Sequence, residues 1–150
     1  IMDCCHDISD VHGLHSSSHL HAVYSPDSHM GASYTIKAGI RAVQEQYKDI
    51  SSHYLMFVVA DQPYLKKESL IKLINEVKSA DDSQAKVFSL RCGSLPGNPC
   101  VFHGSIIPEL MELEGDQGGR RVLKKYDCVY VDIDDPKELC DIDIRDVNGL

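Results

Sequence analysis

Hydrophobic and polar positions follow two alternating periods along this chain. Short apolar runs rich in strand-forming residues predict strands at residues 20–24, 54–60, 86–92, 100–102 and 128–133. Between most of these runs, apolar residues recur every three or four positions, which predicts helices at 33–47, 66–79, 105–113 and 118–126. Alternating strands and helices predict a three-layer α/β/α, Rossmann-like domain with a mostly parallel sheet.

The length, composition and charge of the chain fit one globular domain. Its 150 residues are 43% hydrophobic and 25% charged, and they can bury a substantial core. The formal net charge of -8 argues against a nucleic-acid binder, because such a protein needs a cationic surface. No apolar stretch approaches the roughly 20 residues that span a bilayer, so we expect no membrane partner.

The cysteines indicate a reducing compartment. They lie in or beside apolar runs and without compact spacing, which predicts free core thiols rather than disulfides. We therefore expect a cytoplasmic protein. The residues are Cys4, Cys5, Cys92, Cys100, Cys128 and Cys140.

One carboxylate stands at the end of the most strand-like run. The apolar stretch that ends at Ala60 leads to Asp61, and Pro63 then stops any strand ladder. In open α/β sheets, ligands bind at the carboxyl ends of the strands, so Asp61 is placed to hold a metal ion against a phosphate. An aspartate so close to a proline can equally close a turn.

A magnesium site of this kind needs one or two carboxylates, and Asp116 is the natural second candidate. Asp116 lies among Gly115, Gly118 and Gly119, which permit close backbone approach to a ligand or a tight interhelical turn. Arg120 follows at the start of a predicted helix. Its guanidinium could clamp a phosphate with two hydrogen bonds or lie on a solvated helix face.

Two further stretches combine small residues with polar groups. Gly31, Ser33 and Thr35 stand at the start of a predicted helix, where free N–H groups favour an anion or a base carbonyl. Alternatively, Ser33 or Thr35 serves as the N-cap. The stretch Gly97-Asn98-Pro99 enters a strand from a turn, which aims the Asn98 amide at a ligand or forms a plain loop.

Other clusters offer weaker metal sites. The histidines at 12, 15, 19 and 21 have a helix-like spacing only at the first step, which favours a surface helix and loop over zinc binding. The acidic runs 132–135 and 141–143 alternate with isoleucine. This alternation favours a half-exposed terminal strand and a turn over a cation site.

Taken in order, these motifs resemble the MobA-like nucleotidyltransferases, and most closely their molybdenum cofactor cytidylyltransferase branch. The stretch from Ser25 to Gly39 is similar to that branch's NPxWxxGMxxSLxAG, and Ala60-Asp61-Gln62-Pro63 matches ADQP. Further along, 97–99 is similar to GHP, 115–120 to GDQGAR and 134–143 to DDPxxxxDIDTPED.

The resemblance implies a fold of the nucleotide-diphospho-sugar transferase type and a reaction. CMP passes from CTP to the terminal phosphate of molybdopterin, pyrophosphate leaves, and Mg²⁺ is the cofactor. Asp61 would hold the ion between the reacting phosphates, and Asp116 would be a second ligand or a substrate contact. The nucleotide would lie by Gly31, Ser33 and Thr35, and the pterin by Gly97, Asn98, Pro99, Gln117 and Arg120.

The chain departs from the family pattern in places. Asn98 stands where the branch has histidine, and Thr35 where it has serine. The family's opening LAAGxSxRMGxxK segment, which forms the loop around the triphosphate, is not in the sequence. We therefore expect residues 1–150 to form a single domain that is truncated at its N-terminus relative to the family.

Two alternative functions stay open. One is transfer from CTP or another nucleoside triphosphate to a different phosphate acceptor. The other is a non-catalytic accessory protein that carries molybdopterin to a molybdenum hydroxylase client, because the pterin-side motifs are present without the triphosphate loop.

Overall fold

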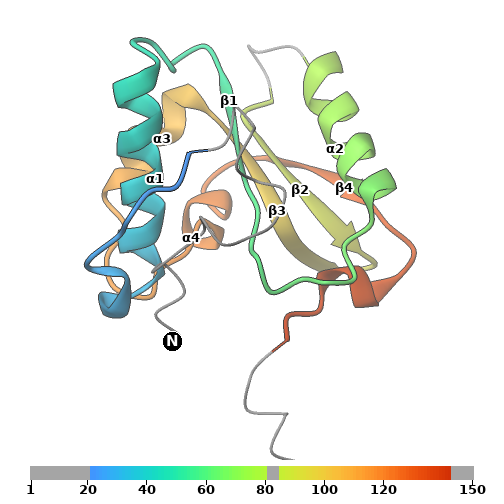
Figure 1. The fold of residues 1–150 in the computed structure, drawn as a ribbon. Coiled ribbons are helices and arrows are strands. Elements are labelled where there is room, and N and C mark those ends of the chain that lie inside the picture. Colours follow the sequence, from blue (N-terminus) through green and yellow to red (C-terminus); the bar gives the residue numbers. More distant parts are fainter. Residues whose placement is uncertain (1–20, 81–84, 143–150) are drawn as a thin grey trace, which may run out of the picture.

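The computed structural model describes residues 21–80 and 85–142 of the chain (Figure 1). None of the helices in these two ranges is both long and apolar enough to cross a membrane. The helices are η2 (Ser28–Met30), α1 (Ala32–Gln46), α2 (Lys67–Ser79), η3 (Gly104–Ile106), α3 (Ile107–Met111), α4 (Arg120–Leu123) and η4 (Pro136–Leu139). The strands are β1 (Tyr54–Phe57), β2 (Val87–Cys92), β3 (Leu95–His103) and β4 (Cys128–Asp132).

The four strands form one mixed sheet in the order β1-β3-β2-β4. β3 is antiparallel to both of its neighbours, and only β2 and β4 pair in parallel. The prediction of a mostly parallel sheet is therefore wrong for the strands that the structure describes. β1, β2 and β4 do run in a common direction, but β3 runs the opposite way between β1 and β2.

A tight turn explains this reversed strand. Cys92 pairs with Leu95, so only Gly93 and Ser94 separate β2 from β3. Gly93 has a φ of +59°, a left-handed conformation that suits glycine in a two-residue hairpin turn. The apolar pattern predicts a longer loop and a short strand at 100–102. It therefore misses that the chain folds straight back along β2.

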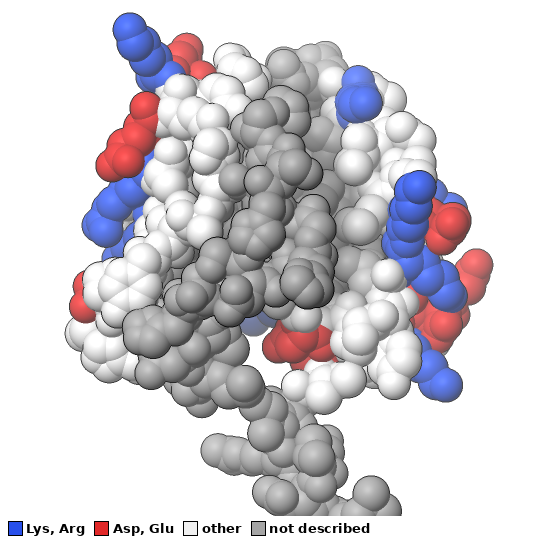
Figure 2. Space-filling model, in the orientation of Figure 1, with Lys and Arg blue, Asp and Glu red and all other residues white. Residues whose placement is uncertain are grey.

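Apolar side chains cover both faces of the sheet. On one face, Phe102 of β3 packs in a cluster with Ile40 of α1 and Leu110 of α3. On the other face, Phe88 of β2 packs with Leu73 of α2. Figure 1 shows α1 and α3 on one side of the sheet and α2 on the other. Charged side chains lie along the α1 and α2 flanks of the molecule (Figure 2), as expected for amphipathic surface helices.

Two expected strands differ from the observed ones. Residues 21–24 are not in a strand. β1 ends at Phe57, and Val58 is 53% exposed, so the predicted buried strand up to Ala60 is wrong. The register of β1 with β3 gives the reason. Phe57 pairs with Cys100, and the next position of β3 is Pro99, which has no N–H to continue the ladder.

Candidate functional site

A pocket of about 710 Å³ opens beside α1, β1 and β3. Its floor is apolar and includes Phe57 and Phe102. Each of the predicted motif stretches 31–39, 60–63, 97–99 and 115–120 contributes to its wall. The residues on which the following argument depends are Thr35, Asp61, Asn98, Gly118 and Gly119.

Asp61 brings a carboxylate to this pocket. The side chain is exposed, and within the described parts of the chain it makes no hydrogen bond or ion pair. The backbone around it is held in place: the Asp61 carbonyl accepts a hydrogen bond from the Ile142 N–H at 2.9 Å. The Gln62 side chain, only 8% exposed, donates to the Leu139 carbonyl at 3.4 Å. Asp61 is thus a fixed carboxylate with uncommitted oxygens.

The polar groups around Asp61 fit Mg²⁺, which takes part of its ligands from substrate and water. They do not fit a metal site whose ligands all come from the protein. Among the residues of known placement, no group of three or more His, Cys, Asp or Glu could hold an ion. Mg²⁺ commonly takes one or two carboxylates and completes its shell with phosphate oxygens and water. An uncommitted Asp61 in an open pocket supplies that kind of ligand.

Asp116, the predicted second ligand, is placed differently. It is exposed and is not among the residues that line the pocket with Asp61. Its neighbour Gly115 packs against the start of α1, where the Ser33 N–H donates to the Gly115 carbonyl at 3.1 Å. Gln117 turns back to its own loop, since its side-chain oxygen accepts from the Glu114 N–H at 3.3 Å. Joint metal binding by Asp61 and Asp116 stays a prediction.

The start of α1 is covered rather than open. Gly31 occupies the N-cap position, and no side chain caps this helix, so the alternative of a Ser33 or Thr35 cap is wrong. Ser33 is fully buried, and its hydroxyl has no partner among the described atoms. The expected free N–H of Ser33 is taken by Gly115. Thr35, which lines the pocket, is the hydroxyl of this motif that can reach a ligand there.

The Gly97-Asn98-Pro99 stretch faces the same pocket through Asn98. The Asn98 side-chain oxygen accepts a weak bond from the Cys100 thiol at 3.6 Å, which leaves its amide nitrogen for a ligand. Pro99 is buried beneath it. Arg120 lies further out, where its guanidinium donates to the Pro96 carbonyl and tethers the turn before Asn98.

The alternation of Asp with Ile predicts a half-exposed terminal strand and a turn over 132–135 and 141–143, and β4 does end at Asp132. Asp141 is exposed and precedes Ile142, whose N–H bonds to Asp61. Residues 141 and 142 are in neither a strand nor a turn, so that expectation is wrong for them. The alternation of Asp with Ile does not indicate the hydrogen bond between the Ile142 N–H and the Asp61 carbonyl, because these two residues are far apart in the sequence. Asp143 and the histidines at 12, 15 and 19 lie outside the described residues.

The thiol on the pocket floor is not set up for chemistry. Cys100 is buried, and burial raises its pKa. Cys128 belongs to the same apolar cluster, and burial raises its pKa to about 12. A thiol with a raised pKa is a poor nucleophile and a poor metal ligand at neutral pH. The polar side chains left to act in this pocket are therefore those of Asp61, Thr35 and Asn98.

This gives a direct prediction about thiol reactivity. At pH 8 the Cys128 thiolate fraction is about 10⁻⁴, because its pKa lies about four units higher. We expect iodoacetamide to alkylate the exposed Cys140 quickly and Cys128 at least about a hundredfold more slowly, as measured by peptide mass spectrometry. Protein unfolded in guanidinium serves as the control and should react at both positions. Equal rates in the folded protein would contradict this packing.

The fold and the pocket place the protein in the class of mixed α/β domains, with an uncommitted carboxylate, the helix α1 and a glycine loop around one pocket. The chain belongs to a particular family of that class. The family model of the MobA-like NTP transferase domain matches residues 4–129. This match covers most of the chain, so the chain belongs to the MobA-like NTP transferase family.

A solved structure has a similar fold. It is the crystal structure of a homolog of Mycobacterium tuberculosis Rv0371c from Mycobacterium sp. strain JC1, and it is 19% identical with a TM-score of 0.55. The alignment covers 69% of this chain and 48% of that chain, so the present chain matches about half of its length. The comparison with curated proteins gave no match.

Proposed function

We propose that this chain serves the transfer of CMP from CTP to the terminal phosphate of molybdopterin in the cytoplasm, with release of pyrophosphate. The observation that carries the proposal is the uncommitted Asp61 carboxylate in a pocket shared with Thr35 and Asn98. Family membership supports the nucleoside triphosphate. The choice of CTP and molybdopterin rests on the order of the motifs.

The chemistry requires positioning more than covalent participation by the protein. An acceptor phosphate oxygen forms a bond to the α-phosphorus while the bond from that phosphorus to pyrophosphate breaks. Asp61 would hold Mg²⁺, which when bound neutralises charge on the phosphates. Thr35 would hydrogen-bond the nucleotide, and Asn98 would orient the pterin. Gly118 and Gly119 give the reactants close access to backbone.

Substitutions of Asn98 and Thr35 can test the pterin side and the nucleotide side of the pocket separately. We expect Asn98→Ala to raise the apparent KM for molybdopterin about tenfold and to leave CTP affinity unchanged, because one hydrogen bond is lost. Thr35→Ala, the matched control across the pocket, should weaken CTP binding instead. Steady-state kinetics with each substrate varied in turn measures both effects. If both variants weaken the same substrate, the assignment of the two sides is wrong.

Transfer itself is the test of the proposed activity. Protein carrying this chain is incubated with CTP labelled at the α-phosphate, Mg²⁺ and molybdopterin, and the products are separated. Labelled cytidylylated molybdopterin supports the proposal. Label on another phosphate acceptor instead would reassign the substrate. Tight molybdopterin binding without any transfer would favour the accessory function.

A further inference from the structure

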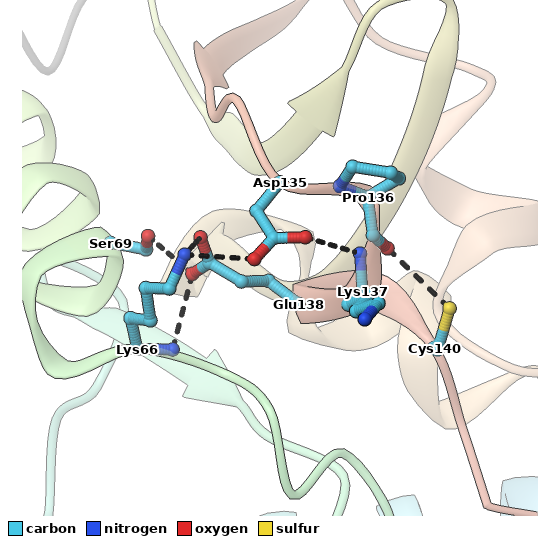
Figure 3. A network of polar contacts seen from close by, with 7 residues as sticks. All are labelled: Lys66, Ser69, Asp135, Pro136, Lys137, Glu138 and Cys140. Carbon is cyan, nitrogen blue, oxygen red and sulfur yellow. Dashed lines mark hydrogen bonds and ion pairs between the residues drawn. The ribbon is translucent and has the colours of Figure 1, made fainter.

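The segment that follows β4 is tied to the start of α2 by a network of polar contacts (Figure 3). At its centre is Glu138, only 3% exposed, which accepts hydrogen bonds from the Ser69 hydroxyl at 2.5 Å and the Lys66 N–H at 3.1 Å. The Lys66 ammonium lies 3.2 Å from Glu138 and 3.0 Å from Asp135. A carboxylate is costly to bury, and these donors offset that cost.

Glu138 lies against the start of α2. The N-cap residue Lys66 makes no side-chain cap, and Glu138 of η4 accepts hydrogen bonds from the Lys66 N–H and from the hydroxyl of Ser69 in the first turn of this 13-residue helix. A negative charge at a helix N-terminus is favourable, because the unpaired N–H groups there carry partial positive charge. Burial by itself raises the pKa of Glu138, but the donors Ser69 and Lys66 lower the pKa by more, and the carboxylate is ionised at neutral pH.

The same segment continues to both sides of the pocket. The Leu139 carbonyl accepts from the Gln62 side chain, and the Ile142 N–H donates to the Asp61 carbonyl. On the other side, a Cβ at Gly97 would lie 2.8 Å from the Leu139 side chain, so this side chain rests directly on the residue before Asn98. Residues 135–142 thus link α2, the Asp61 turn and the Asn98 stretch.

We propose that Glu138 is a positioning residue: it anchors residues 135–142 to α2 and so fixes the turn that presents Asp61. Among the described residues, the Glu138 carboxylate makes its hydrogen bonds and ion pair with Lys66 and Ser69, which do not line the pocket. Its effect passes through Leu139 and Ile142 to the backbone of Gln62 and Asp61. The proposal rests on the proposed function of Asp61 as the metal ligand.

The first test is the affinity for Mn²⁺, used as a probe in the presence of CTP and measured by electron paramagnetic resonance on the 150-residue chain. We expect Glu138→Gln to weaken Mn²⁺ binding about tenfold, the size of effect seen when residues that orient a metal ligand are changed. Glu138→Asp should restore part of the affinity. Glu68→Gln is the matched control: it removes an exposed carboxylate from the same helix turn and should change nothing.

A second measurement does not depend on metal. Amide hydrogen exchange reports whether the Ile142 N–H still bonds to Asp61. In Glu138→Gln we expect exchange at Ile142 to become at least about tenfold faster, while amides of the β2–β3 ladder keep their protection. If Glu138→Gln does not fold, Gln62→Met replaces it, because it removes the Leu139 contact at similar volume.

The two measurements separate the possible failures. Unchanged Ile142 exchange and unchanged Mn²⁺ affinity in Glu138→Gln overturn the positioning role. Mn²⁺ binding that is the same in wild type and Asp61→Asn overturns the proposed function of Asp61, and the exchange result then decides the anchoring role of Glu138 alone. If both proposals hold, Glu138→Gln should cause no further loss of Mn²⁺ affinity in an Asp61→Asn background.

Discussion

Asp61→Asn, in protein that includes the family's opening segment, is expected to lower cytidylyl transfer at least about a hundredfold, the loss seen when one key electrostatic group is removed from an active site. Within the described residues the Asp61 side chain bonds to nothing, so an amide of the same shape removes charge without disturbing a contact. The fold should stay intact. Turnover at saturating Mg²⁺ and CTP measures the first effect, and the thermal unfolding midpoint measures the second.

Two other aspartates make the comparison specific. Asp127→Asn changes an exposed carboxylate that does not line the pocket of Asp61, and it should leave transfer unchanged. Asp116→Asn tests the second predicted ligand: a loss comparable to that of Asp61→Asn would place Asp116 in the metal site. Full turnover by Asp61→Asn at saturating Mg²⁺ would reject the assignment of Asp61.

Gly31→Ala is expected to destabilise the protein by about 2–4 kcal/mol, the combined size of backbone strain and overpacking. Gly31 has a φ of +129°, which residues with a Cβ rarely adopt. A Cβ there would also lie 2.3 Å from the Gly115 carbonyl carbon, which is backbone and cannot rotate away. The free energy of unfolding in urea measures the loss.

Gly39→Ala is the matched control in the same region. Gly39 lies inside α1, and no atom lies within 4 Å of the place its Cβ would take. Alanine should therefore stabilise the helix by about 0.5–1 kcal/mol. If Gly31→Ala is no more destabilising than Gly39→Ala, the close contact between the start of α1 and the Gly115 loop is wrong.

The two longer helices, α1 and α2, could be predicted because their apolar spacing is local, whereas the helices predicted at 105–113 and 118–126 are shorter in the structure. Ile36 and Ile40 mark the buried face of α1, and Leu73 and Val77 mark that of α2. The direction of β3 could not be predicted in the same way. It depends on one glycine turn and on which neighbours the strand meets, and apolar runs look alike whether strands pair in parallel or antiparallel. The early end of β1 was missed for a related reason, because it depends on its partner Pro99.

The pocket was predictable in part: Asp61, Thr35 and Asn98 belong to separate motifs that the fold brings to one pocket, whereas the other predicted site residues, Asp116 among them, do not line it. The contacts that hold those residues in place could not be predicted from the sequence. Glu138 and Ser69 are 69 positions apart, and neither stands in a pattern that indicates the other. The covered start of α1 likewise depends on Gly115, a residue distant in sequence. Such contacts follow from the tertiary fold and leave no periodic signal.

The central claim is that Asp61 presents a metal ligand to a nucleotide in the pocket beside α1. A crystal structure of the protein with Mg²⁺ and a non-hydrolysable CTP analogue tests it most directly. We predict the ion at roughly 2.0–2.1 Å from an Asp61 carboxylate oxygen, bridging to the phosphates, with the nucleotide near Thr35. A nucleotide bound outside this pocket, or an ion held away from Asp61, would contradict the account.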